Sequence, residues 1–201
     1  MKKLFVFALA AVAALVACNP DPEADPNETK DVPSWPAEDA TTVCLNEVNG
    51  TLKGIEIYNP TDAEVSLAGW TIVKNNESPA YWEGVTEDKI PAKGFMVIQT
   101  SKPSADLVAL PILFATNKGT GGLSGKKALK LELKDATGKT VDFFDRGFTK
   151  AGNTEPALDD LGVNSAARVE DGKAPWRVKV PSYGASNNLA EDLGEVTVDP
   201  V

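Results

Sequence analysis

The chain has 201 residues, a net charge of -9 and no histidine, which excludes a Ser-His-Asp triad, a cysteine–histidine pair and histidine-ligated zinc or haem. Its two cysteines are too few for an all-cysteine zinc site or a disulfide framework. The acidic balance argues against nucleic-acid binding, which requires a basic face.

The first 18 residues predict a targeting segment. Lys2 and Lys3 precede an apolar run from Leu4 to Ala17, which is short for a transmembrane helix of about 20 residues. The run ends in Leu15-Val-Ala-Cys18, which resembles the lipobox of bacterial lipoproteins. We therefore predict a signal peptide over residues 1–17 and acylation of Cys18. The alternative is an ordinary signal peptide followed by a chance cysteine.

Residues 18–41 predict an acidic, proline-rich tether. Proline removes backbone donors and the acidic side chains repel one another, so no core forms here. The composition predicts an extended spacer of about 70 Å that holds a domain clear of a membrane. No aspartate follows Cys18, so the inner-membrane retention signal is absent. The acidic residues behind it resemble the surface-export signal of Bacteroidota lipoproteins. We expect a lipid-anchored envelope protein of the outer membrane, exposed on the cell surface.

Residues 42–188 predict one all-β domain, because the apolar residues recur with period two. In chain order, strands are predicted at 54–58, 64–67, 70–73, 95–98, 127–134, 140–144, 166–169 and 176–180. The run Phe95–Ile98 is apolar on both faces, as in a central, doubly covered strand. Asp135–Gly138 predicts a hairpin turn between two of the strands. No amphipathic helix of about ten residues or more is predicted.

Residues 189–201 are acidic. They are predicted to be either a frayed tail or a short last strand through Val196 and Val198. Cys44 is expected to be buried as a small apolar residue, and no histidine is available to activate it.

Several motifs, taken together and in order, resemble the lamin tail domain family. They are Ile55–Ile72, Ile90–Val97, Gly122–Asp142 and the segments around Ser165–Arg168, Trp176 and Pro181–Asn187. The resemblance implies an immunoglobulin-like β-sandwich. It also implies an accessory module without known catalysis, of a kind that often accompanies secreted nucleases, phosphatases or adhesins. The chain departs from the family at Tyr183, where proline is frequent, and in the longer stretches 75–89 and 145–164.

The stretch 75–89 supplies the candidate ligand-binding residues. Tyr81 and Trp82 are adjacent and point in opposite directions on a strand. We expect at least one ring to be exposed, unless the loop folds back, and an exposed ring would anchor a glycan or a protein partner. The alternative is a strand with one ring in the core and the other half-covered.

Other polar and aromatic residues have structural explanations. Glu56 and Asn59 could form a ligand pair, but a backbone-bonding Glu56 and an Asn59 that caps the turn before Pro60 are the preferred interpretation. Trp70 and Trp176 are expected to pack, with Trp70 largely buried. The glycine-rich segment 118–126 lacks the spacing of a phosphate-binding loop.

Four aspartates could supply oxygen ligands for calcium: Asp142, Asp145, Asp159 and Asp160. They lack the spacing of a calcium loop, so no metal site is predicted. The same carboxylates could form a glycosidase pair, but a small sandwich leaves little cleft.

The sequence therefore predicts a non-enzymatic, lipid-anchored binding or adhesion module without a cofactor. Its expected partners are the membrane, through Cys18, and a glycan or protein, with no nucleic acid. The alternatives are a structural subunit that docks to another envelope protein and, as the weakest, a small carboxylate-based hydrolase.

Overall fold

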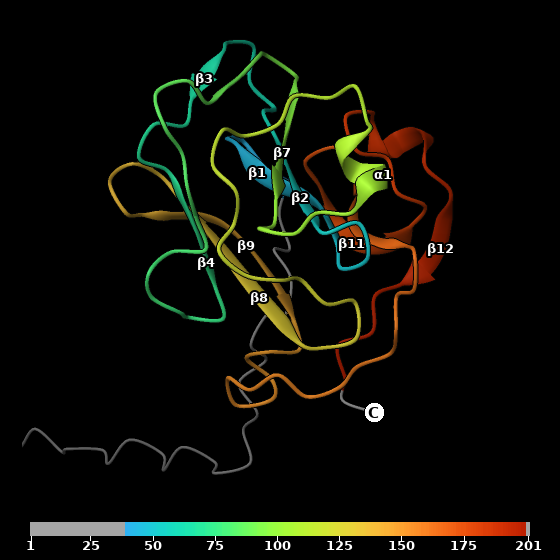
Figure 1. The fold of residues 1–201 in the computed structure, drawn as a ribbon. Helices are drawn as coiled ribbons and strands as arrows, with labels where there is room; N and C mark the ends of the chain where they lie inside the picture. The colour runs from blue at the N-terminus through green and yellow to red at the C-terminus, as the bar shows by residue number, and fades with distance from the viewer. Residues whose placement is uncertain (1–38, 200–201) are drawn as a thin grey trace, which may run out of the picture. The chain divides into compact units, whose positions relative to one another are not determined.

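A computed structural model describes residues 39–199. The predicted signal peptide, the acylation site Cys18 and most of the predicted tether lie outside the described residues. The described residues fall within one compact unit and are built mainly from antiparallel strands (Figure 1).

The larger sheet has six strands in the order β12-β11-β10-β1-β2-β7. Their bounds are β1 Cys44–Asn49, β2 Gly54–Tyr58, β7 Phe95–Gln99, β10 Ser165–Glu170, β11 Lys173–Lys179 and β12 Asp192–Glu195. Strand β1 lies inside this sheet and pairs with β10 on one side and β2 on the other. All six of its residues are buried, so polar residues on this strand are forced into the interior.

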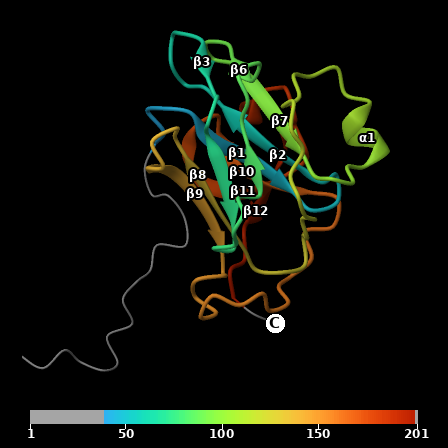
Figure 2. The same ribbon diagram turned by 60° about the vertical axis from the view of Figure 1, so that its left-hand side comes forward.

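A second sheet has four strands in the order β5-β4-β8-β9, and a third pairs β3 with β6. Their bounds are β3 Val65–Ser66, β4 Thr71–Lys74, β5 Trp82–Glu83, β6 Lys89–Ile90, β8 Leu129–Lys134 and β9 Thr140–Arg146. The β3–β6 pair lies at one end of the domain (Figure 2).

The main core lies between the two larger sheets. Leu129, Leu131 and Leu133 of β8 are buried, while the residues between them are half-buried. They join apolar residues of β1 and β2 in one cluster. This arrangement confirms the predicted all-β, immunoglobulin-like sandwich, because a period-two strand buries one face against the facing sheet.

Strand β7 is covered on both faces, but the prediction that it is central is wrong. It is the last strand of the six-stranded sheet. Met96 and Ile98 enter the main core, and Val97 packs in a second cluster with Leu107 and Tyr183. Its outer edge bonds to a loop, since the Val97 N–H donates to the Leu113 carbonyl at 2.9 Å.

The helical elements are short. The helix α1 spans Ala105–Val108 and lies beside β7 (Figure 2), and a 3-10 turn spans Asn187–Leu189. Among residues 39–199, no helix is long and apolar enough to cross a membrane.

Both ends of the described chain contact the domain. Near the N-terminal end, Ala40 N–H donates to the Gly172 carbonyl at 2.8 Å, and Asp39 pairs with Lys173 at 2.7 Å. At the C-terminal end, β12 pairs with β11, and Val196 is buried in the core. The strand therefore forms four residues earlier than the predicted strand through Val196 and Val198.

Candidate functional site

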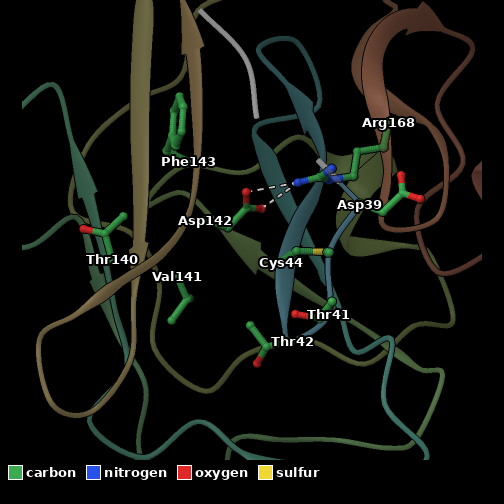
Figure 3. A pocket seen from close by; sticks show the side chains of 10 residues that line it. Asp39, Thr41, Thr42, Cys44, Thr140, Val141, Asp142, Phe143 and Arg168 are labelled. Carbon is green, nitrogen blue, oxygen red and sulfur yellow. Dashed lines mark hydrogen bonds and ion pairs between the residues drawn. The ribbon is translucent and has the colours of Figure 1, made fainter. Parts of the chain in front are cut away.

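A cavity of about 340 Å³ opens between the first residues of the described chain and β9. Its lining residues are Asp39, Ala40, Thr41, Thr42, Cys44, Thr140, Val141, Asp142, Phe143 and Arg168. They come from the segment that leads into β1, from the first residue of β1, from β9 and from β10 (Figure 3). The cavity thus lies where β9, at the edge of one sheet, faces the start of a strand of the other sheet.

A buried ion pair joins the two sheets beside this cavity. The Nη2 atom of Arg168 donates to both carboxylate oxygens of Asp142, each at 3.0 Å (Figure 3). The Arg168 Nε donates to the Leu45 carbonyl at 2.8 Å, and Leu45 N–H donates to Asp142 at 2.8 Å. The guanidinium carbon lies 5.5 Å from the centre of the Trp176 ring. These contacts fix both charges and neutralise one with the other.

Cys44 faces the cavity but is not a nucleophile. Its thiol is buried, contacts the Tyr58 carbonyl at 3.7 Å, and has its pKa raised to about 12 by burial. The thiolate is therefore absent at neutral pH. This confirms that Cys44 is a buried, apolar residue.

The walls of the cavity combine polar, apolar and ion-paired groups. Thr41 and Thr140 are exposed and Thr42 is half-buried, so hydroxyl groups are accessible there. Val141 and Phe143 supply apolar surface. Asp39 is paired with Lys173, and Asp142 is paired with Arg168. Such walls can bind a ligand through hydrogen bonds and contact area.

A second polar cluster is buried on the other face of the six-stranded sheet. Glu47 of β1 lies opposite Glu56 of β2, and neither side chain is exposed. A β-bulge at Asn46, between Leu45 and Glu47, turns Glu47 away from the core while Leu45 and Val48 still enter it.

These carboxylates hold the segment 181–189, here called the closing turn, against the sheet. Ser182 N–H donates to Glu47 at 3.1 Å, and Gly184 N–H donates to Glu56 at 2.6 Å. The Tyr183 hydroxyl donates to the Gly54 carbonyl at 2.7 Å. The cluster is thus a structural attachment with two buried acids at its centre.

The expected exposure of Tyr81 or Trp82 is wrong, because both rings are 2% exposed and belong to the main core. The Trp82 indole N–H donates to the Asn117 carbonyl at 3.1 Å. Gly119 lies directly on Tyr81, since a Cβ at Gly119 would come within 2.3 Å of its ring. The loop after α1 therefore covers both rings, and neither is available to a ligand.

The four aspartates do not converge on one site. Asp142 pairs with Arg168, and Asp145 accepts from Phe148 N–H at 2.9 Å. Asp160 pairs with Lys126, and the Asp159 carbonyl accepts from Arg146. Within the described residues, no group of three metal-ligating side chains is found.

The structural interpretations of Glu56 and Asn59 agree with the contacts. The Asn59 Oδ1 accepts from Thr61 N–H at 3.0 Å, and its amide donates to the Ala63 carbonyl at the end of the turn and to the Pro91 carbonyl just after β6. Trp176 is buried and packs edge-on against Phe144, with ring centres 4.7 Å apart. Trp70 is only half-buried and packs at the margin of the core.

The roles of Glu47 and Arg168 are not evident from the sequence. The available signal was a charged residue inside a segment of strand character, which is costly unless the charge is paired or neutralised. The bulge that turns Glu47 outward, and the contact of Arg168 with a residue 26 positions away, have no local signature.

Comparison with known proteins agrees with this fold. No curated protein matches the chain. A family model described as the lamin tail domain matches residues 36–147, which is more than half of the chain. The matched region therefore ends just after β9, and β10 to β12, which follow it in sequence, complete the six-stranded sheet. The chain belongs to the lamin tail domain family.

Proposed function

We propose that the chain is a non-catalytic binding module, held at the bacterial cell envelope by an acylated Cys18. Membership of the lamin tail domain family suggests a non-catalytic binding or structural module. The sequence Leu15-Val-Ala-Cys18 supports the anchor, and the acidic residues behind it support exposure on the outer surface.

The observation that carries the binding role is the cavity beside Arg168. Its volume of about 340 Å³ is at the small end of ligand sites, which span roughly 300–1,000 Å³. Each charged side chain of its lining already has an ionic partner, which disfavours an ionic ligand. The threonine hydroxyls and the apolar Val141 and Phe143 favour a neutral, hydroxyl- or amide-rich group, such as the end of a glycan or a polar protein segment.

A specific observation favours a second role, as a structural subunit that docks to another envelope protein. Leu189 is 87% exposed, and Val180 and Leu193, on neighbouring segments, are also exposed. Apolar side chains that gather on a surface are typical of protein contacts.

The anchor is tested by intact-mass analysis of the protein extracted from membranes. We expect Cys18 to be the first residue and to carry acyl chains, and Cys18→Ser to release the protein. A mature chain that begins at another residue and is found in the medium contradicts the anchor, whatever the domain binds.

The binding role is tested with the mature chain on a glycan array and in a pull-down from envelope extract. Thr42→Val and Thr140→Val each remove a hydroxyl from the cavity, and Thr116→Val is the control at an exposed threonine outside it. A lost hydrogen bond is worth about 0.5–1.5 kcal/mol, so we expect binding weaker by about two- to tenfold in the first two variants only. Binding that survives both changes but is lost in Leu189→Ser favours the docking role.

A further inference from the structure

The carboxylates of Glu47 and Glu56 are buried side by side with only neutral donors around them. In the described part of the chain, Glu47 has hydrogen-bond contacts with Ser165 and Ser182, and Glu56 accepts from Asn46 and Gly184. A buried carboxylate is stable as an ion only when a cation or many strong donors compensate for its lost hydration. Two such ions in register on adjacent strands also repel each other.

The charged groups around the pair add to this repulsion. From the turn between β10 and β11, Asp171 is a third acid, which accepts from Asn46 and from Asn187 N–H. Lys179 of β11 is the nearby buried cation, but its Nζ donates to the carbonyls of Val169 and Asn187 instead.

The remaining neighbours of the pair are uncharged at neutral pH. Beside Glu56 on β7 lies Val97, and the second cluster adds Leu107 from α1 and Tyr183 from the closing turn. On the β10 side, Arg177 lies one strand beyond Ala167 and pairs with Asp192 and Glu195. Within residues 39–199, no ion pair therefore joins either carboxylate to a cation.

We infer that Glu47 and Glu56 together retain a proton at neutral pH, and that loss of this proton releases the closing turn from the sheet. The turn is the layer that separates the two carboxylates from water, since both Ser182 and Gly184 bond to them. Opening the turn would hydrate the second negative charge and relieve the repulsion.

The hydrogen-bond partners are compatible with a retained proton. The hydroxyl oxygens of Ser165 and Ser182 lie 2.6 and 3.0 Å from Glu47, and a hydroxyl can accept as well as donate. A protonated Glu47 therefore keeps both contacts. Burial raises the pKa of Glu47 to about 7, and burial followed by the neighbouring Glu47 charge raises the pKa of Glu56 well above its usual range. Because the two carboxyls interact, each titration step describes the pair and not one residue alone.

The direction of the pH effect follows from these raised pKa values. The folded state binds the proton more tightly than the unfolded chain does. The proton's contribution to the stability of the folded state is therefore complete below the ordinary glutamate pKa of about 4.5. It is lost as the pH rises through about 7 and above. Release of the turn would also change a groove of about 330 Å³ that Tyr183, Ser182 and Pro181 line together with Leu52, Asp106, Leu110 and Ala185. The inference does not depend on the proposed envelope role.

The decisive experiment is a carboxyl-carbon NMR titration of the mature chain in detergent micelles, combined with amide exchange. We expect one of the two carboxyl signals to titrate above about pH 6. The amides of Ser182 and Gly184 should lose protection between about pH 6 and about pH 8, relative to the Leu131 amide in the other sheet.

Two variants test whether ionisation of the carboxyl pair controls the attachment of the closing turn. In Glu56→Gln a second negative charge cannot form, so protection of Ser182 should no longer depend on pH relative to Leu131. Burial should still keep the pKa of Glu47 above its usual range. The control Glu132→Gln, on β8, should behave as the parent. The inference is overturned if both carboxyls of the parent titrate below about pH 5, or if the proton is retained while protection of the turn follows Leu131. The parent titration decides the first point even if a variant does not fold.

Discussion

Two buried arginines have their hydrogen-bond donors satisfied in different ways. Arg168 has a carboxylate partner, Asp142. Arg146 instead donates to three carbonyls, those of Gly125, Asp159 and Thr197. The first arginine joins the two sheets, and the second joins three loops at the end of β9. A single guanidinium can do either, because its five donors are fixed in a plane.

Loss of the Asp142 charge should destabilise the domain strongly. Asp142→Asn leaves the Arg168 guanidinium buried without its counter-ion, which typically costs about 3–5 kcal/mol. Urea unfolding measures this cost. The matched change Asp160→Asn removes a carboxylate from an exposed pair with Lys126 and should leave the midpoint nearly unchanged, because water and salt screen such pairs. Equal midpoints for the two variants would show that the ion pair contributes little.

Two glycines of one loop should respond differently to alanine. A Cβ at Gly119 would meet the Tyr81 ring at 2.3 Å, whereas a Cβ at Gly122 would meet nothing within 4 Å. Overpacking of this kind costs about 1–3 kcal/mol, so Gly119→Ala should lower the thermal midpoint and Gly122→Ala should leave it nearly unchanged. If both are neutral, the loop does not press on Tyr81 in solution.

At the scale of elements, short strands depend on a few large side chains. Strand β5 has only two residues, and one of them is Trp82, which is buried against Ile72 of β4 and the rest of the core. Trp70, just before β4, packs at the margin of the core and is half-buried. The packing role expected of Trp70 therefore belongs more fully to Trp82.

Trp82→Ala should cost about 3–5 kcal/mol, the usual range for emptying a large core site. Trp70→Ala should cost clearly less, because part of its ring already contacts water. Denaturant midpoints of the two variants, measured by circular dichroism, provide the comparison. A larger loss of stability in Trp70→Ala than in Trp82→Ala would contradict the deeper burial of Trp82.

The predicted elements that formed were those with local signals. The alternation of Leu129, Leu131 and Leu133 predicts β8, and the turn at Asp135–Gly138 forms, since Gly138 has a φ of +85°. The position of β7 was not predictable, because an apolar run shows that both faces are covered but not what covers them. For Tyr81 and Trp82, adjacent residues on an ideal strand face opposite ways. The loop at Gly119 covers both, and that contact is not local in sequence.

At the scale of the whole molecule, the folded part extends beyond residue 188. Val196 is buried and the Thr197 carbonyl accepts from Arg146. The cavity also could not be predicted, because its walls come from the segment before β1, from β9 and from β10. The sequence shows that Cys44, Asp39 and Asp142 are present, but it does not show that the fold brings them together around one cavity.

A chain that ends at Asn188 should therefore be less stable than one that ends at Asp199. It loses β12 and the burial of Val196, which alone is worth about 1.5–3 kcal/mol, and it leaves a donor of Arg146 without a partner. Thermal unfolding of the two chains measures the difference. Equal midpoints would show that the last strand does not contribute to the fold.

The two ends of the six-stranded sheet also bear on self-association. Open strand edges invite neighbouring copies to add by backbone pairing, which leads to aggregation. Along β7 this edge is occupied, because Gly119 N–H donates to the Gln99 carbonyl at 2.7 Å and Ala115 N–H donates to the Val97 carbonyl at 2.9 Å. Along β12 it is short and acidic, with Asp192 and Glu195, and Gly194 departs from strand geometry at a φ of +123°. Copies crowded together should therefore remain separate at both ends of this sheet, and a dense layer of the domain would stay a layer of individual molecules.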